Sequence, residues 1–218
     1  MQTQSKEVLA GQAVYSKLFL RVYDLWVLGI SNSFIWKCPS AKILQHFNSY
    51  QSNNHLDVGV GTGYYLDKCN FKREARIGLM DMNLNSLEVT SARIKRYNVE
   101  KYQQNILDPI QQGIKLFDSI SLNFLFHCIP GSITEKGIAF DHLVPLLNKG
   151  GTVFGSTILQ DSSLKTNGIA KKLMGIYNKK GIFCNEGDTL AGLESALKKR
   201  FTSHGIQVEG CVALFWAR

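Results

Sequence analysis

The residues His55-Leu-Asp57-Val-Gly59-Val-Gly61-Thr-Gly63-Tyr64 decide the fold of this chain. Three glycines alternate with small or β-branched residues, directly after an apolar run that carries one acid, Asp57. Because only glycine lacks a Cβ atom, such a turn lets the backbone come very close to a ligand. The pattern predicts a buried strand at about 55–60, then a glycine turn, then a short helix whose free N–H groups face the ligand.

A second predicted strand supports a nucleotide ligand. Arg76-Ile-Gly-Leu-Met-Asp81 ends in an acid about twenty residues after the glycine turn, where a ribose needs a hydrogen-bond acceptor. The glycine spacing is Gly-x-Gly-x-Gly, not the Gly-x-Gly-x-x-Gly of nicotinamide and flavin dehydrogenases. Asp57 would also repel a pyrophosphate. Both features favour a ligand with a positively charged end, and no Gly-Lys-Ser/Thr of a phosphate-binding loop follows.

Strands and helices alternate along the rest of the chain. The sequence predicts further strands at about 101–105, 117–123 and 152–158, and two more in the tail 205–218 with Glu209-Gly210 as their turn. It predicts helices at about 39–49, 85–97, 133–148, 163–180 and 188–201, and one or two amphipathic helices before residue 35. This order is typical of an α/β fold with a parallel sheet, to which the tail adds an antiparallel edge.

Composition sets the class of protein. A chain of 218 residues with 44% hydrophobic and 19% charged residues suits one globular domain with a substantial core. Five separated cysteines without a Cys-x-x-Cys pair indicate reduced thiols in a cytoplasmic protein, and the histidines show no metal-ligand spacing. The polar N-terminus and the lack of a long apolar run predict neither a signal peptide nor a transmembrane span.

The net charge of +8 has two interpretations, a nucleic-acid partner or solvated helix faces. The basic residues gather at 93–101, 165–180 and 198–200, in segments with helical patterns. None of these segments interleaves with stacking aromatic residues as single-strand binding would favour. The sequence therefore favours solvated helix faces and makes nucleic acid the less expected partner.

Together these motifs resemble the class I S-adenosylmethionine-dependent methyltransferases. The resemblance rests on Asp57-x-Gly59-x-Gly61-x-Gly63, on Asp81, on a polar residue after the third strand, and on Gly150-Gly151 before the fifth. It covers about residues 50–160. Trp36-Lys-Cys-Pro39 and His127-Cys-Ile-Pro-Gly131 make the chain similar to small stand-alone members.

The resemblance implies a doubly wound, mainly parallel seven-stranded sheet with an antiparallel last strand, the Rossmann-like methyltransferase fold. We expect a single domain over 1–218. Within it, residues 1–50 would form an N-terminal helical cap and 51–160 the cofactor-binding core. Residues 161–218 would supply C-terminal helices and edge strands.

The resemblance also implies how S-adenosylmethionine would bind. The glycines would admit its methionine part, and Asp57 would contact its amino end directly or through water. Asp81 would accept hydrogen bonds from both ribose hydroxyls, and Met82 would pack on the adenine. Asn105 would accept a hydrogen bond from the adenine amino group, where the family usually has an acid. The expected cofactor-binding residues are Asp57, Gly59, Val60, Gly61, Gly63, Asp81, Met82, Asn83, Asn105, Ile106, Leu107 and Asn123.

Methyl transfer from a sulfonium is an in-line displacement, so the enzyme mainly aligns the reactants and excludes water. His127, directly after the fourth strand, is the candidate general base, and a histidine that only shapes its loop is the alternative. Candidate acceptor and lid contacts are Tyr15, Tyr23, Trp36 and Phe124, with ordinary core packing as the alternative for the aromatic residues of the N-terminal helices.

The predicted function is S-adenosylmethionine-dependent methyl transfer to a small, largely apolar acceptor, with S-adenosylhomocysteine as the second product. The chain lacks the Asn/Asp-Pro-Pro-Tyr motif that amino-methylating nucleic-acid enzymes carry after the fourth strand. Two alternatives stay open: an RNA methyltransferase that uses the basic helices, and a non-catalytic cofactor-binding protein of the same fold. The sequence leaves the acceptor atom and the oligomeric state open, a homodimer included.

Overall fold

The computed structural model describes residues 31–218. Tyr15, Tyr23 and residues 1–30 of the segment predicted to form the N-terminal helices lie outside the described residues. In the described part of the chain, no helix is both long enough and apolar enough to cross a bilayer.

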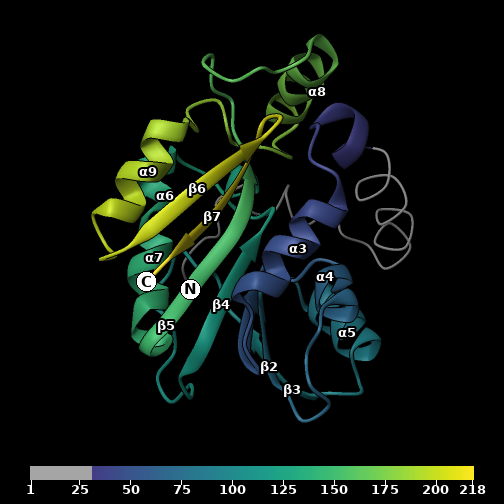
Figure 1. Ribbon diagram of the computed structural model, residues 1–218, viewed down its shortest axis with the longest axis vertical. Helices are drawn as coiled ribbons and strands as arrows, with labels where there is room; N and C mark the ends of the chain where they lie inside the picture. The colour runs from purple at the N-terminus through teal and green to yellow at the C-terminus, as the bar shows by residue number, and fades with distance from the viewer. Residues whose placement is uncertain (1–30) are drawn as a thin grey trace.

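Within residues 31–218, seven strands form one sheet in the order β3-β2-β1-β4-β5-β7-β6 (Figure 1). They are β1 (Asn54–Val58), β2 (Arg76–Asp81), β3 (Asn98–Gln103), β4 (Phe117–Asn123), β5 (Leu147–Ile158), β6 (His204–Glu209) and β7 (Val212–Ala217). The first five strands pair in parallel, and β7 lies antiparallel between β5 and β6. The predicted seven-stranded sheet with a reversed last strand is confirmed.

Helices cover both faces of this sheet, as Figure 1 shows. One face packs against α3 (Ser40–Tyr50), α4 (Tyr64–Lys68), α5 (Leu84–Arg93) and α8 (Gly168–Lys179). The other packs against α6 (Ile133–Lys136), α7 (Ile138–Leu143) and α9 (Leu190–Lys198). Two apolar cores result, one on each face, so the sheet is doubly wound as expected. The strand order reverses between β1 and β4, which is where α/β sheets of this kind bind ligands.

Several predicted elements have other bounds in the structure, and the third strand and the helix at 133–148 are two of them. The third strand begins at Asn98, three residues before the predicted 101, because this edge strand has no buried residue to mark its start. The predicted helix 133–148 is divided into α6, α7 and a 3₁₀ turn η3 (Val144–Leu146). Gly137 separates α6 from α7, and Pro145 has no N–H group with which to continue a helix.

The fifth strand is longer than predicted. The turn expected at Lys149–Gly151 lies inside β5, where the register with β4 shifts between Phe117 and Ser119. Gly150 has a φ of +79° at this irregularity, a value that favours glycine. Consequently β5 begins at Leu147, five residues before the predicted start.

Candidate active site

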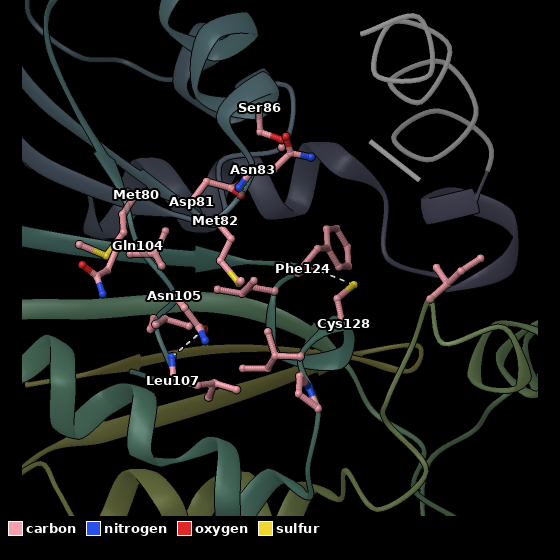
Figure 2. A pocket seen from close by; sticks show the side chains of 18 residues that line it. Met80, Asp81, Met82, Asn83, Ser86, Gln104, Asn105, Leu107, Phe124 and Cys128 are labelled. Atoms are coloured by element: carbon pink, nitrogen blue, oxygen red, sulfur yellow. Dashed lines mark hydrogen bonds between the residues drawn. The ribbon is translucent and has the colours of Figure 1, made fainter. Parts of the chain in front are cut away.

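A cavity lies at the carboxyl ends of β1, β2 and β4, at the reversal of strand order (Figure 2). Its lining comes from the glycine turn, the start of α5, the segment after β3 and the segment after β4. The lining residues are Val58, Gly59, Gly61, Met80, Asp81, Met82, Asn83, Ser86, Gln104, Asn105, Ile106, Leu107, Phe124, Leu125, Cys128, Ile129, Pro130 and Ile182.

The three glycines of the turn do not occupy equivalent positions. Gly61 has a φ of +53°, and no atom lies within 4 Å of the place where its Cβ would be, so this backbone borders open space. Gly63 has a φ of +72°, and its Cβ would lie 2.6 Å from the Thr90 side chain. Gly63 therefore allows α4 to pack on α5. Gly59 and Gly61 line the cavity, and Gly63 and Val60 do not.

Asp81 ends β2 at the edge of the cavity, as Figure 2 shows. Its Oδ1 accepts the backbone N–H of Asn83 at 2.8 Å. Burial raises the pKa of Asp81 to about 6, while N–H groups that include those of Asn83 and Val60 favour the ionised form. The Asn83 side chain caps α5 by accepting a hydrogen bond from the Asn85 N–H. Met82 stands between Asp81 and Asn83 in the chain. The result is a carboxylate at a helix N-terminus, open to a ligand's hydroxyl groups.

Asn105 follows β3 and also lines the cavity. Its Oδ1 accepts the Leu107 N–H at 3.1 Å (Figure 2), and its Nδ2 donates to Asp108 at 3.0 Å. Ile106 and Leu107 add apolar wall beside it. Gln104, which sequence reasoning missed, completes this side; its position directly after a strand end was the available signal.

Asp57 lies under the glycine turn with only 7% of its surface exposed, and it does not line the cavity. Ser121 on β4 donates its hydroxyl to Asp57 Oδ1. Burial raises the pKa of Asp57 to about 7; the Ser121 hydroxyl opposes this rise and Asp81 adds to it. Among the described residues, no Lys or Arg forms an ion pair with Asp57. A buried acid without a cationic side chain fits a ligand that brings its own positive charge.

Asn123 ends β4 and does not line the cavity. Its Oδ1 accepts the Ser156 hydroxyl at 3.0 Å. Its Nδ2 is buried and has no hydrogen-bond partner among the described residues. Buried polar groups are normally paired, so this amide has a donor that the described residues leave unused, and its predicted cofactor contact stays a prediction.

His127 is placed away from the cavity lining, in the 3₁₀ turn η2 (Phe126–Cys128). Only 3% of its surface is exposed. Its Nδ1 accepts the Ile158 N–H at 3.3 Å, and its ring packs on Phe183 at 4.5 Å. Burial, with a smaller contribution from Lys136, lowers the pKa of His127 to about 3. These contacts match the alternative of a loop-shaping histidine and do not support the predicted base.

The segment after β4 forms an apolar wall that faces the glycine turn. Phe124 lines the cavity as predicted, with a φ of +54°. Cys128 lies beside it, its Sγ 3.8 Å from the Phe124 carbonyl oxygen (Figure 2). Burial raises the pKa of Cys128 to about 12, so this thiol stays neutral. Sequence reasoning missed the other members of the wall, which are Leu125, Ile129, Pro130 and Ile182.

Trp36 is buried, with 2% of its surface exposed, and packs against Phe183 at a ring distance of 5.9 Å. It does not line the cavity. Its backbone oxygen accepts the Cys211 N–H at 3.2 Å, which fixes the chain before α3 to the start of β7. The structure therefore places Trp36 in the core, in agreement with the packing alternative.

This fold and this cavity define a class of protein. The reversed β7 matches the methyltransferase fold that the sequence predicts. The open backbone at Gly61 and the acids near the ends of β1 and β2 fit a cationic nucleoside cofactor. A family model described as "Methyltransferase domain" matches residues 56–153. The chain belongs to the class I S-adenosylmethionine-dependent methyltransferases, and its cofactor is S-adenosylmethionine.

Particular relatives support this assignment. The demethylluteothin O-methyltransferase of Streptomyces thioluteus is 37% identical over 213 residues, which cover 97% of this chain and 92% of that protein. The physcion biosynthesis cluster O-methyltransferase of Aspergillus chevalieri is 36% identical over 210 residues, covering 95% and 94%. A solved structure titled "DhpI-SAH complex structure" superimposes with a TM-score of 0.68 at 15% identity, covering 99% of this chain and 98% of that one, and shows the shared fold.

Proposed function

We propose that this enzyme methylates a hydroxyl oxygen of a small, largely apolar acceptor. The observation that carries the proposal is the apolar wall at 124–130, which lines the same cavity as Gly59 and Gly61 of the glycine turn. A wall of this composition favours an apolar ring or chain over a phosphate-rich polymer. Two relatives that match nearly the whole chain are named O-methyltransferases, which supports oxygen as the acceptor atom.

The residues of the cavity divide into two groups in this proposal. S-adenosylmethionine supplies a methyl group on a sulfonium, which an acceptor oxygen can displace in line. Asp81 accepts hydrogen bonds from the ribose hydroxyls, and the segment at 104–107 holds the adenine. Gly59 and Gly61 admit the methionine part, with Asp57 beneath them. The wall at 124–130 holds the acceptor and excludes water, which is how proximity and desolvation lower the barrier.

The titratable groups of the cavity suggest an acidic acceptor hydroxyl. Among the described lining residues, only Asp81 and Cys128 titrate. Asp81 lies on the nucleoside side, and Cys128 has a pKa of about 12 and stays neutral. His127 is buried behind the wall with its Nδ1 already accepting an N–H. A phenol or an enol loses its proton in water more readily than an alkyl alcohol, so such acceptors need little help from a base.

A panel of acceptors on one ring skeleton tests the proposal. The purified protein is incubated with S-adenosylmethionine and a phenol, an enol, a benzylic alcohol, an aniline or a thiophenol, and S-adenosylhomocysteine release is measured. We expect turnover with the phenol or enol and less than about one tenth of that rate with the benzylic alcohol. Preferential methylation of nitrogen or sulfur would contradict an O-methyltransferase, and cofactor binding without turnover of any acceptor would indicate a non-catalytic protein.

A further inference from the structure

A row of buried polar side chains crosses two central strands on the face that α3 covers. His55 pairs with Ser119 and Asp57 with Ser121 in the parallel register of β1 and β4. His55 and Ser121 are fully buried and Ser119 is 1% exposed. Central parallel strands are normally apolar on both faces because helices cover both. Four polar residues in this position need a physical reason.

The hydrogen bonds in this row have a single direction. Asp57 can only accept when it is ionised, so the Ser121 hydroxyl donates its one hydrogen to Asp57 Oδ1. His55 Nε2, 2.9 Å from Ser121 Oγ, must then carry the hydrogen and donate it. His55 Nδ1 is left as an acceptor for the Ser119 hydroxyl at 2.7 Å. The Ser52 backbone N–H donates to Ser119 at 2.8 Å and begins the row.

Aromatic packing holds the His55 ring in one orientation. Phe47, Phe71 and Phe154 surround it with ring centroids at 5.3, 5.4 and 5.8 Å. Burial lowers the pKa of His55 to about 3, so the ring is neutral, as the single hydrogen on Nε2 requires. Every donor in the row therefore points toward Asp57, and the row orients hydrogen bonds without transferring a proton.

We propose that His55 is a positioning residue for cofactor binding, which acts through Ser121 to orient the Asp57 carboxylate under the glycine turn and to favour its ionised form. A donor that is itself hydrogen-bonded donates more strongly, and donation to a carboxylate favours its charged form. The proposal rests on the proposed function, because it takes Asp57 to serve the amino end of S-adenosylmethionine.

Two ligands separate this role from ordinary core packing. S-adenosylhomocysteine carries the amino end, whereas 5′-methylthioadenosine keeps the adenosine and the thioether and lacks the amino acid. Calorimetry would measure both ligands on the wild type, His55→Phe, His55→Gln and Ser121→Ala. Phenylalanine keeps an aromatic ring in the aromatic surroundings, and glutamine restores an N–H donor near the place of Nε2.

We expect His55→Phe and Ser121→Ala to weaken S-adenosylhomocysteine binding about tenfold or more, which is the size of a lost hydrogen bond to a charged group. Binding of 5′-methylthioadenosine should change by less than about threefold, and His55→Gln should recover most of the lost affinity. His46→Phe is the matched control: His46 lies on the same face against Phe154 but bonds the Phe215 carbonyl. It should leave both affinities near those of the wild type.

Each other outcome has a distinct meaning. If His55→Phe and Ser121→Ala bind S-adenosylhomocysteine as the wild type does, the positioning role is overturned. Equal losses for both ligands would assign His55 to packing alone and overturn it as well. If the wild type binds 5′-methylthioadenosine but not S-adenosylhomocysteine, the proposed function itself fails. Circular dichroism shows whether His55→Phe folds, and Ser121→Ala, the smaller change, carries the test if it does not.

Discussion

Asp57 and Asp81 are two acids that burial makes harder to ionise at the place where a cation should bind. Burial raises the pKa of Asp57 to about 7 and that of Asp81 to about 6. An ammonium or sulfonium nearby would favour the charged forms and so lower both values. Cofactor binding and deprotonation of these acids are therefore linked.

The sign of this linkage gives a prediction about pH. The free protein holds more protons than the complex between about pH 5.5 and 7, so affinity for S-adenosylmethionine should fall as pH falls, by up to about tenfold per unit for each acid. Calorimetry at pH 6 in buffers of different ionisation enthalpy should show proton release on binding. Asp57→Asn should bind more weakly and lose the dependence near pH 7. Affinity that stays constant from pH 5.5 to 7.5 would contradict the linkage.

Asp81 gives a second prediction at the residue scale. Asp81→Asn keeps an oxygen for the Asn83 N–H but removes the charge and one acceptor. Because hydrogen bonds to a charged group are worth about 1.5–3 kcal/mol each, S-adenosylhomocysteine should bind at least about tenfold more weakly. Glu88→Gln is the control, since Glu88 is an exposed acid of α5 that pairs with Lys101. Calorimetry that finds equal affinity for Asp81→Asn and Glu88→Gln would remove Asp81 from the site.

At the scale of elements, the glycine turn contains one glycine that borders the cavity, Gly61, and one that allows two helices to pack, Gly63. Gly61→Ala adds a methyl group to open space, and Gly63→Ala places one 2.6 Å from Thr90, while both residues have positive φ. We expect each change to cost about 1–3 kcal/mol of stability from backbone strain, with the larger loss for Gly63→Ala. We expect Gly61→Ala to lose more cofactor affinity. Urea unfolding measures the loss of stability, and calorimetry measures the loss of cofactor affinity. A larger stability loss for Gly61→Ala together with a larger affinity loss for Gly63→Ala would contradict these roles.

A buried ion pair connects α6 to the segment 182–188. Lys136 of α6 and Asp188 are both fully buried, and Lys136 Nζ lies 2.6 Å from Asp188 Oδ2 and donates to the Cys184 carbonyl at 2.6 Å. This contact ties α6 to the 182–188 segment, which supplies Ile182 to the cavity. Burial raises the pKa of Asp188 to about 6, with Lys136 opposing the rise.

Removing one partner should therefore cost more than removing both. Lys136→Met leaves a buried carboxylate unpaired and should lower the free energy of unfolding by about 3–5 kcal/mol. Lys136→Met combined with Asp188→Leu should recover more than half of that loss, because no uncompensated charge remains. Urea unfolding of the wild type, the single variants and the double variant gives the coupling. Additive losses would show that the pair is not the main constraint on this segment.

The sequence predicts these elements unevenly, for physical reasons. β1 and β2 lie close to their predicted bounds, because a short apolar run and a glycine turn are local signals. β3 was misplaced because an exposed edge strand carries no such run. Ile182 joins the cavity from a segment far along the chain, which no local pattern indicates. His127 was singled out by its place after β4, but its burial depends on Phe183, again a distant residue.

At the scale of the molecule, the +8 charge is the feature that could still favour RNA as a partner. Lys171, Lys172 and Lys179 of α8 are solvent-exposed, and so is Lys180 directly after it. Several other basic residues pair within the fold, as Arg200 does with Asp141 and Arg96 with Asp67. Such a distribution matches solvated helix faces better than a continuous track for a phosphate backbone.

Salt dependence distinguishes these interpretations in one series. We expect kcat/KM for a neutral phenolic acceptor to change by less than about threefold between 50 and 300 mM NaCl, because the apolar wall releases no counterions. Fluorescence anisotropy measures binding to total tRNA, which should be weak and should fall steeply over this range. A variant with Lys171, Lys172, Lys179 and Lys180 changed to Gln should bind tRNA still more weakly. The same variant should leave phenol methylation unchanged. Transfer of labelled methyl groups to tRNA at 150 mM salt, lost in that variant, would make RNA the substrate and the apolar wall a secondary feature.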